Sequence, residues 1–225
     1  MAYFEKGFIE FFTELEKNNE REWYHANKAN YEKYVKKPFE LFVTDLIKLI
    51  QKHDKNVQVE AKQCIFRIYR DVRFSKDKTP YKLNTSAIIG KDGRKGGSIP
   101  GSYVEMSHKH FRFYGGCYNP EKQNLMDIRY EIANNPAAFK NLYNNKNFKK
   151  HYGDLRGARN KILPADLKEP ALTEPYILNK QFYYFEEMDP SILLSDDLMK
   201  VCEKNYLASQ PMLDFLTKAG GYAEL

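Results

Sequence analysis

The chain has 225 residues, of which 42% are hydrophobic and 15% aromatic, and its 36 lysines and arginines against 30 acidic residues give a formal net charge of +6. This hydrophobic content excludes a disordered chain, and the length suits one large domain or two small ones. The net charge excludes no partner, since a mildly basic chain can contact nucleic acid, an anionic membrane or a phosphorylated small molecule.

The first 52 residues are predicted to be helical. Residues 3–16 should form an amphipathic helix, because large apolar residues recur at spacings of three and four: Phe4, Phe8, Phe11, Phe12 and Leu15. A second helix should begin near residue 20. Pro38 should interrupt it and become a first-turn residue of a third helix, where a missing N–H is tolerated.

After the helical region, the spacing of the hydrophobic residues changes from the helical period to alternation, which predicts strands. In the strand expected at residues 64–69, Arg67 and Tyr69 face away from the core. Asp92-Gly93 is a favoured hairpin turn, and hairpins between consecutive strands predict an antiparallel sheet. The other strands are expected at residues 57–59, 85–89, 103–107, 110–114 and 182–185.

Helices should return after Pro120 and at Pro136, and the stretch from residue 152 to 175 is irregular. Two helices should close the chain, with the Ser195 hydroxyl as a cap. Helices, then strands, then helices predict an α+β fold, in which N-terminal and C-terminal helices cover an antiparallel sheet from the middle of the chain. Since no repeat or linker is present, residues 1–225 are expected to form a single domain.

The positive charge is concentrated in one stretch. Residues 61–97 contain ten basic and three acidic residues, a balance of +7, so the rest of the chain sums to −1. This local excess favours one localised anion site over a diffusely basic surface. The basic residues are Lys62, Arg67, Arg70, Arg73, Lys76, Lys78, Lys82, Lys91, Arg94 and Lys95.

Within this stretch, residues 67–82 read RIYRDVRFSKDKTPYK. Here the sequence resembles the domain of unknown function 2461 family. Three further segments carry the resemblance over nearly the whole chain: NNEREWYHANKANYEKYVKKPFE at 18–40, GGCYNPEKQNLMDIR at 115–129 and PMLDFL at 211–216. The resemblance implies a conserved hypothetical protein and supplies no reaction, cofactor or catalytic residue, so the residues themselves must carry the functional argument.

The arginines of this segment suit an anion. Three of them lie within seven positions and repel one another unless carboxylates or a bound anion separate them. Our first hypothesis is therefore a site for a phosphorylated or carboxylated small molecule. In an enzyme, Asp71 would orient an arginine or act as a base, and Lys78 and Tyr81 would donate protons. The predicted anion ligands are Arg67, Arg70, Arg73, Lys78 and Lys82.

The same residues equally fit a structural role, because an arginine–aspartate network commonly pins a loop to its sheet, and Asp71 and Asp77 are local partners. A second hypothesis places a pocket wall on the second helix, where Trp23, Asn27 and Tyr31 share one face and could orient a polar ligand. More commonly such a face is core, so the wall matters only if it faces the arginines.

No metal site and no cofactor are expected. The cysteines Cys64, Cys117 and Cys202 are odd in number and lack C-x-x-C spacing. His108 and His110 are expected as solvated residues at a hairpin turn, without a third ligand.

Three functions remain open: an anion-binding protein or enzyme, a nucleic-acid-binding module that uses residues 61–97, or a structural, partner-binding protein, which includes a homodimer. The closely interleaved charges make nucleic acid the less favoured ligand. A cytoplasmic location without a membrane partner is expected, because the first residues lack a basic n-region and no apolar run approaches the roughly 20 residues that span a bilayer.

Overall fold

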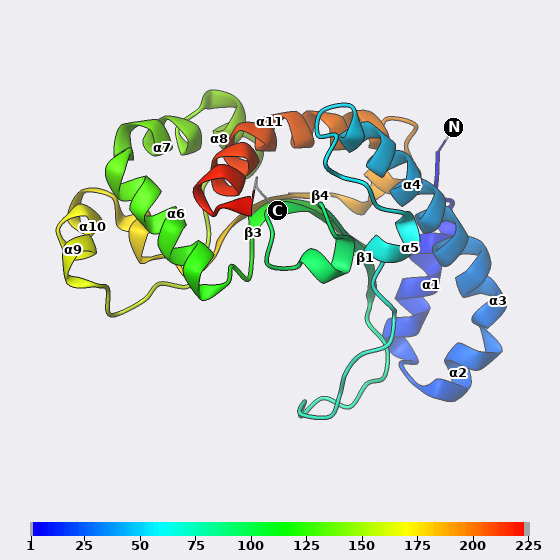
Figure 1. Cartoon of the computed structure of the whole chain (residues 1–225). Helices are drawn as coiled ribbons and strands as arrows, with labels where there is room; N and C mark the ends of the chain where they lie inside the picture. The colour runs from blue at the N-terminus through cyan, green and yellow to red at the C-terminus, as the bar shows by residue number, and fades with distance from the viewer. Residues whose placement is uncertain (1, 223–225) are drawn as a thin grey trace. The chain divides into compact units, whose positions relative to one another are not determined.

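The computed structural model describes residues 2–222 and has the predicted α+β fold (Figure 1). Four antiparallel strands from the middle of the chain form one sheet, and helices occupy both ends of the sequence. The chain divides into two compact units, and the expectation of a single domain stays a prediction. Unit 1 is Met1–Arg94, Tyr103–Phe113 and Glu187–Glu203; unit 2 is Lys95–Ser102, Tyr114–Glu186 and Lys204–Leu225.

Helices with buried apolar faces form the first part of unit 1. The predicted first helix is confirmed, and Phe8, Phe12 and Leu15 on its inner face are fully buried. Pro38 lies in the first turn of α4 (Lys37–Gln51), as expected, but it does not interrupt the preceding helix, because the π-helical η1 (Tyr31–Lys36) runs directly into α4. These elements are α1 (Lys6–Lys17), α2 (Arg21–Ala26), α3 (Lys28–Asn30), the π-helical η1 (Tyr31–Lys36), α4 (Lys37–Gln51) and α5 (Ala61–Cys64).

The strand predicted at residues 64–69 is wrong, because Cys64 ends the short helix α5 and the residues after it make isolated bridges only. Glu60 and Gln63 form a capping box there, in which the Glu60 amide donates to Gln63 Oε1 at 2.7 Å. The residues that follow make isolated antiparallel bridges and keep the expected alternation, so that Arg67 is exposed.

The strands predicted at residues 85–89, 103–107, 110–114 and 182–185 are confirmed, whereas the strand predicted at 57–59 is wrong, because these residues have no regular secondary structure. Alternate residues of the second and third strands are buried, as expected when one face of a sheet is covered. In unit 1, α4 packs against the first strand. The connection between the first two strands turns at Gly93, whose φ is +55°. The strands are β1 (Asn84–Ile89), β2 (Gly101–Ser107), β3 (Phe111–Cys117) and β4 (Phe182–Met188), paired in the order β1-β2-β3-β4.

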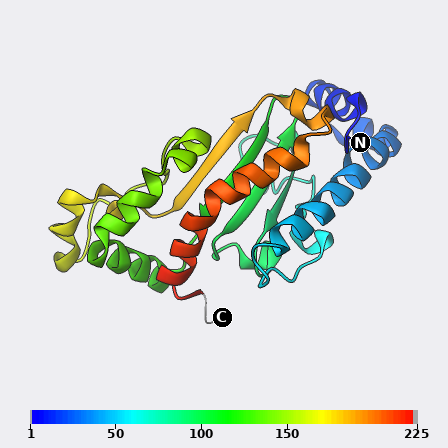
Figure 2. The same ribbon diagram turned by 90° about the horizontal axis from the view of Figure 1, so that it is seen from above.

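Unit 2 has its own apolar core, in which Phe139, Phe182 and Tyr184 are fully buried. The Tyr184 hydroxyl lies 2.7 Å from Ser209 Oγ, which joins β4 to the last helix (Figure 2). The stretch expected to be irregular contains short helical turns. The helical elements are α6 (Lys122–Asn134), α7 (Pro136–Tyr143), α8 (Lys146–Tyr152), α9 (Ala165–Lys168), α10 (Pro170–Thr173), η3 (Pro175–Leu178) and most of α11 (Leu198–Ala219).

The prediction of two closing helices is wrong, because after Ser195 a single long helix, α11, continues through Pro211; the 3-10 turn η4 (Pro190–Leu194) precedes Ser195. Ser195 lies before α11, and its hydroxyl accepts a hydrogen bond from the Asp197 amide at 3.1 Å, as the sequence predicts. Among the residues that the structure describes, no helix has the length and apolar character to cross a membrane.

Candidate functional site

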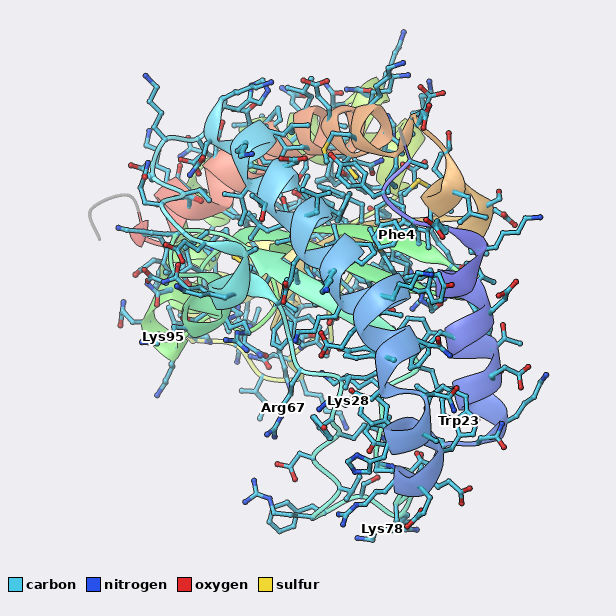
Figure 3. The ribbon with its side chains drawn as sticks, turned by 90° about the vertical axis from the view of Figure 1, so that its right-hand side faces the viewer. Phe4, Trp23, Lys28, Arg67, Lys78 and Lys95 are labelled. Carbon is cyan, nitrogen blue, oxygen red and sulfur yellow. The ribbon has the colours of Figure 1, made fainter. Side chains whose placement is uncertain are left out.

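The arginine-rich segment folds back on itself as an extended arm in unit 1, which we define as residues 68–82. Backbone hydrogen bonds join its two sides: the Lys82 amide donates to the Ile68 carbonyl at 2.8 Å, and the Arg70 amide to the Pro80 carbonyl at 2.9 Å. Figure 3 labels Lys78, which lies toward the turn of the arm, away from these bonds.

Asn19 and Tyr81 fasten the base of the arm to the helices. Asn19 Nδ2 donates to the Tyr81 carbonyl at 3.0 Å, and the Tyr81 amide donates to Asn19 Oδ1 at 3.1 Å. The Tyr81 ring is 2% exposed and stacks on Tyr24 of α2, with centroids 4.2 Å apart and planes inclined by 22°. The base of the arm is therefore held in a fixed position beside α2.

Inside the arm, two of the predicted anion ligands are bonded to its own carboxylates. Arg70 bonds Asp77 at 2.5 Å and also the Thr79 hydroxyl. Arg73 makes two bonds to Asp71, at 3.0 and 2.7 Å. The Lys78 ammonium donates to the Val72 carbonyl at 2.9 Å. These contacts show the arginine–aspartate network that the sequence left open as the structural alternative.

The turn of the arm is expected to loosen in strong acid. Hydrogen bonds from the Thr79 amide, from Arg70 and from the Thr79 hydroxyl lower the pKa of Asp77 from 3.8 to about 2. The pKa of Asp77 is lower in the folded than in the unfolded state. Its contribution to the stability of the folded arm is therefore complete above a pH of about 4 and is lost as the pH falls toward 2. The Thr79 amide chemical shift should titrate with a midpoint of about 2; a midpoint of about 4 would contradict these bonds.

A cavity of about 350 Å³ lies in unit 1, between the helices α2 to α4 and the segment that leads into the arm. Its volume falls within the range of small-molecule sites. Three tyrosines contribute to the lining, and their rings cluster: Tyr24 lies 5.5 Å from Tyr31 and 6.0 Å from Tyr69, centroid to centroid. The cavity therefore offers aromatic surface and phenol hydroxyls.

The charged lining of the cavity is mostly basic. Two of its lysines already have partners, since Lys36 pairs with Glu32 at 3.0 Å and Lys62 with Glu60 at 2.7 Å. Five cationic side chains face two carboxylates, which gives a net positive charge; they are Lys28, Lys36, Lys62, Arg67 and Arg94 against Glu32 and Glu40.

Arg67 and Lys28 are the lining cations with free hydrogen-bonding capacity. Arg94 donates to the backbone carbonyls of Gln63 and Lys62, at 3.1 Å each. For the side chains of Arg67 and Lys28, by contrast, no hydrogen bond or ion pair is found within residues 2–222. Figure 3 shows both residues on the same side of unit 1. An incoming anion would find these two groups unoccupied.

Lys82 brings a further cation to the edge of the cavity. Its ammonium lies 5.3 Å from the ring centroid of Phe66, and Phe66 lines the cavity. Burial lowers the pKa of Lys82, the nearby charge of Arg67 lowers it further, and Glu105 opposes the shift. Two cations that repel each other across an edge of the cavity would both be stabilised by an anion between them.

Trp23 and Asn27 of the predicted pocket wall do not line the cavity, whereas Tyr31 does. The Trp23 ring packs on Phe11 of α1, with centroids 5.7 Å apart, and Figure 3 shows it on the opposite side of α2 from Arg67. The Asn27 side chain donates a hydrogen bond to the Trp23 carbonyl at 3.0 Å, so it stabilises the C-terminal end of α2. Of the predicted wall, Tyr31 alone lies at the cavity.

Most of the residues from α2 to α4 that line the cavity form a row with a spacing of four, and Tyr31 lies beside this row. A row of this spacing drifts around an ordinary α-helix, whereas the π-helical turn η1 widens the helix and keeps the row facing the cavity. The spacing was visible in the sequence, and the π-helical turn that aligns it was not. The row is Tyr24, Lys28, Glu32, Lys36 and Glu40.

A larger hollow of about 510 Å³ lies next to α4, and it has no charge excess. Its lysines have partners, since Lys48 pairs with Asp45 at 2.9 Å and Lys62 with Glu60 at 2.7 Å. Volume alone would favour this hollow, but the free cations belong to the smaller cavity.

The histidines of the β2–β3 turn lie at the hairpin as predicted, but they are not free in solvent. His108 has a side chain 9% exposed, and its Nε2 lies 3.1 Å from a Glu16 carboxylate oxygen. His110 Nε2 lies 2.9 Å from Glu105. Within the described chain no group of three or more histidine, cysteine or acidic side chains is arranged to hold a metal ion.

Fold and site together define an α+β protein with a basic, tyrosine-lined cavity beside an arginine-rich arm. The chain belongs to the family described as "Conserved hypothetical protein (DUF2461)", whose model matches residues 7–215. The match confirms the resemblance found in the sequence. A comparison with curated proteins finds no match to this chain.

Proposed function

We propose that the cavity binds a small molecule that carries a phosphate or carboxylate group. The observation that carries the proposal is the pair Arg67 and Lys28, which line the cavity and whose side chains make no hydrogen bond or ion pair within the described residues. Lys82 lies beside Phe66 of the lining, and burial first and the charge of Arg67 second lower its pKa. An anion would relieve the repulsion between Lys82 and Arg67 and accept the planar hydrogen-bond fork of the arginine.

The tyrosines support the same ligand class. Burial raises the pKa of Tyr31 to about 12, and burial also raises the pKa of Tyr24. Both phenols therefore stay protonated at neutral pH and can donate hydrogen bonds to an anion without repelling it. Their rings offer apolar surface to the body of the ligand.

The proposal concerns binding and assigns no reaction. The candidate catalytic groups Asp71 and Lys78 are bonded within the arm, to Arg73 and to the Val72 carbonyl. Tyr81 is buried at the base of the arm. None of these three lines the cavity, so a catalytic role for them stays a prediction that would require the arm to contact the bound molecule.

Arg67→Ala is expected to abolish the thermal response to anions. The wild-type melting temperature should rise in millimolar inorganic phosphate, a nucleotide, a sugar phosphate or a dicarboxylate, because a ligand that binds only the folded state stabilises it. Losing the Arg67 guanidinium should weaken anion binding at least tenfold, since a charge-assisted hydrogen bond contributes about 1.5–3 kcal/mol. Differential scanning fluorimetry with each compound provides the measurement.

Arg73→Ala is the matched control, because it removes an exposed arginine that is bonded to Asp71 and does not line the cavity. It should keep the wild-type response. Equal responses of the two variants would assign the effect to general charge, and a wild-type protein that responds to none of the compounds would refute the proposed function.

A further inference from the structure

The turn of the arm carries an aromatic ring with almost no protein around it. Phe74 is 96% exposed, although a side chain of this size is usually buried. Its one ring contact is with the Arg73 guanidinium, 5.8 Å from the ring centroid. Both faces of the ring are therefore largely accessible to solvent, and the ring adds little to the stability of the fold.

Two lysines lie close to Phe74 in the sequence of the turn. Lys76 and Lys78 are exposed within four positions of Phe74. The carboxylates at the turn are already neutralised, because Asp71 pairs with Arg73 and Asp77 with Arg70. The charge left to a partner is the positive charge of the two lysines, which predicts a polyanionic partner.

Hydrogen bonds fasten the arm at its base, and an ion pair joins its two sides nearer the turn. The Lys82 and Arg70 amides donate across the base, Asn19 binds the Tyr81 carbonyl, and Arg70 pairs with Asp77. A second ring, that of Tyr69, is 47% exposed five residues earlier. These bonds reduce the conformational entropy that the arm loses when it binds a partner.

We propose that the tip of the arm, residues 73–78, binds single-stranded nucleic acid, with a base stacked on Phe74 and the neighbouring phosphates held by Lys76 and Lys78. Exposed rings among cations are the means by which proteins bind single strands without sequence preference. An anionic membrane fits less well, because a single ring offers far less apolar area than a membrane-binding helix does.

This inference is independent of the proposed function, since the tip does not line the cavity. Arg67→Ala should remove the response to small anions and leave the stacking contribution of Phe74 intact. Phe74→Ala should remove the stacking contribution and leave the response to small anions intact. The two proposals can therefore fail separately.

Fluorescence anisotropy of the full chain with a labelled 20-nucleotide oligothymidine at low salt tests the proposal. The wild-type protein should bind, with an affinity that falls steeply as salt rises. Phe74→Ala should weaken binding about tenfold, in line with the contribution of one stacked base. Lys76→Ala should make the logarithmic salt dependence shallower by about 0.7.

Two further substitutions separate stacking from general apolar contact. Phe74→Trp should keep the affinity and Phe74→Leu should lose it, because only an aromatic ring stacks on a base. Leu172→Ala, which removes another exposed apolar side chain (83% exposed), is the control and should bind as the wild type does. All five variants should keep the wild-type melting temperature.

Three results would overturn the proposal. They are no oligonucleotide binding by the wild type at low salt, full binding by Phe74→Leu, or co-sedimentation with phosphatidylserine vesicles in the absence of oligonucleotide binding. The last result would assign the tip to a membrane surface.

Discussion

Gly116→Ala is expected to destabilise the protein by about 3 kcal/mol or more, the sum of backbone strain and steric overlap. Gly116 in β3 has a φ of +117°, a conformation that L-residues rarely adopt. An added Cβ would overlap the Phe182 carbonyl oxygen and lie 2.8 Å from Tyr183 Cα on the neighbouring strand. Both obstacles are backbone atoms, so the sheet itself would have to move. Chemical denaturation monitored by circular dichroism measures the change.

Gly153→Ala isolates the strain from the overlap. Gly153 also has a positive φ, +69°, but an added Cβ would meet no atom within 4 Å. The expected cost is therefore only the conformational one, about 1–2 kcal/mol. If the two alanine variants were equally stable, close packing of β3 on β4 at Gly116 would be refuted.

The fold was predictable wherever the hydrophobic residues of a segment follow one period, either helical or alternating. The spacing of Phe8, Phe12 and Leu15 identifies α1, and alternation identifies the four strands, because each pattern reports which side of one element is buried. The prediction failed at α5, where apolar alternation competes with the capping box of Glu60 and Gln63. A four-residue helix is too short to show a period.

The candidate site was predictable only in its charge. The +7 stretch contains Arg67, Lys62 and Arg94, all of which line the cavity. The guanidinium of Arg94 reaches back to the Gln63 carbonyl, 31 residues earlier, and no local pattern reports such a contact. Trp23 and Asn27, the wall residues that do not line the cavity, precede the π-helical turn. The helix α2 ends at Ala26 and Asn27 leaves the helical conformation, so no single helical face runs from Trp23 to Tyr31.

Tyr81→Ala is expected to cost about 3–5 kcal/mol, because it removes a large, fully packed ring and leaves a cavity. Tyr81 is 2% exposed and lies between Tyr24, 4.2 Å away, and Tyr69, 5.4 Å away, centroid to centroid. Both neighbours line the proposed binding cavity. The variant should therefore lose stability and anion response together, as measured by denaturation and by thermal shift.

Two companion variants show whether the ring or the hydroxyl of Tyr81 matters. Tyr69→Ala removes the partner ring across the arm, which is 47% exposed, and should cost about 1 kcal/mol or less. Tyr81→Phe keeps the ring and its stacking on Tyr24, so its stability and anion response should match the wild type. If Tyr81→Phe were stable but lost the response, the Tyr81 hydroxyl would belong to the binding site, and the base of the arm would be a functional wall in addition to a structural anchor.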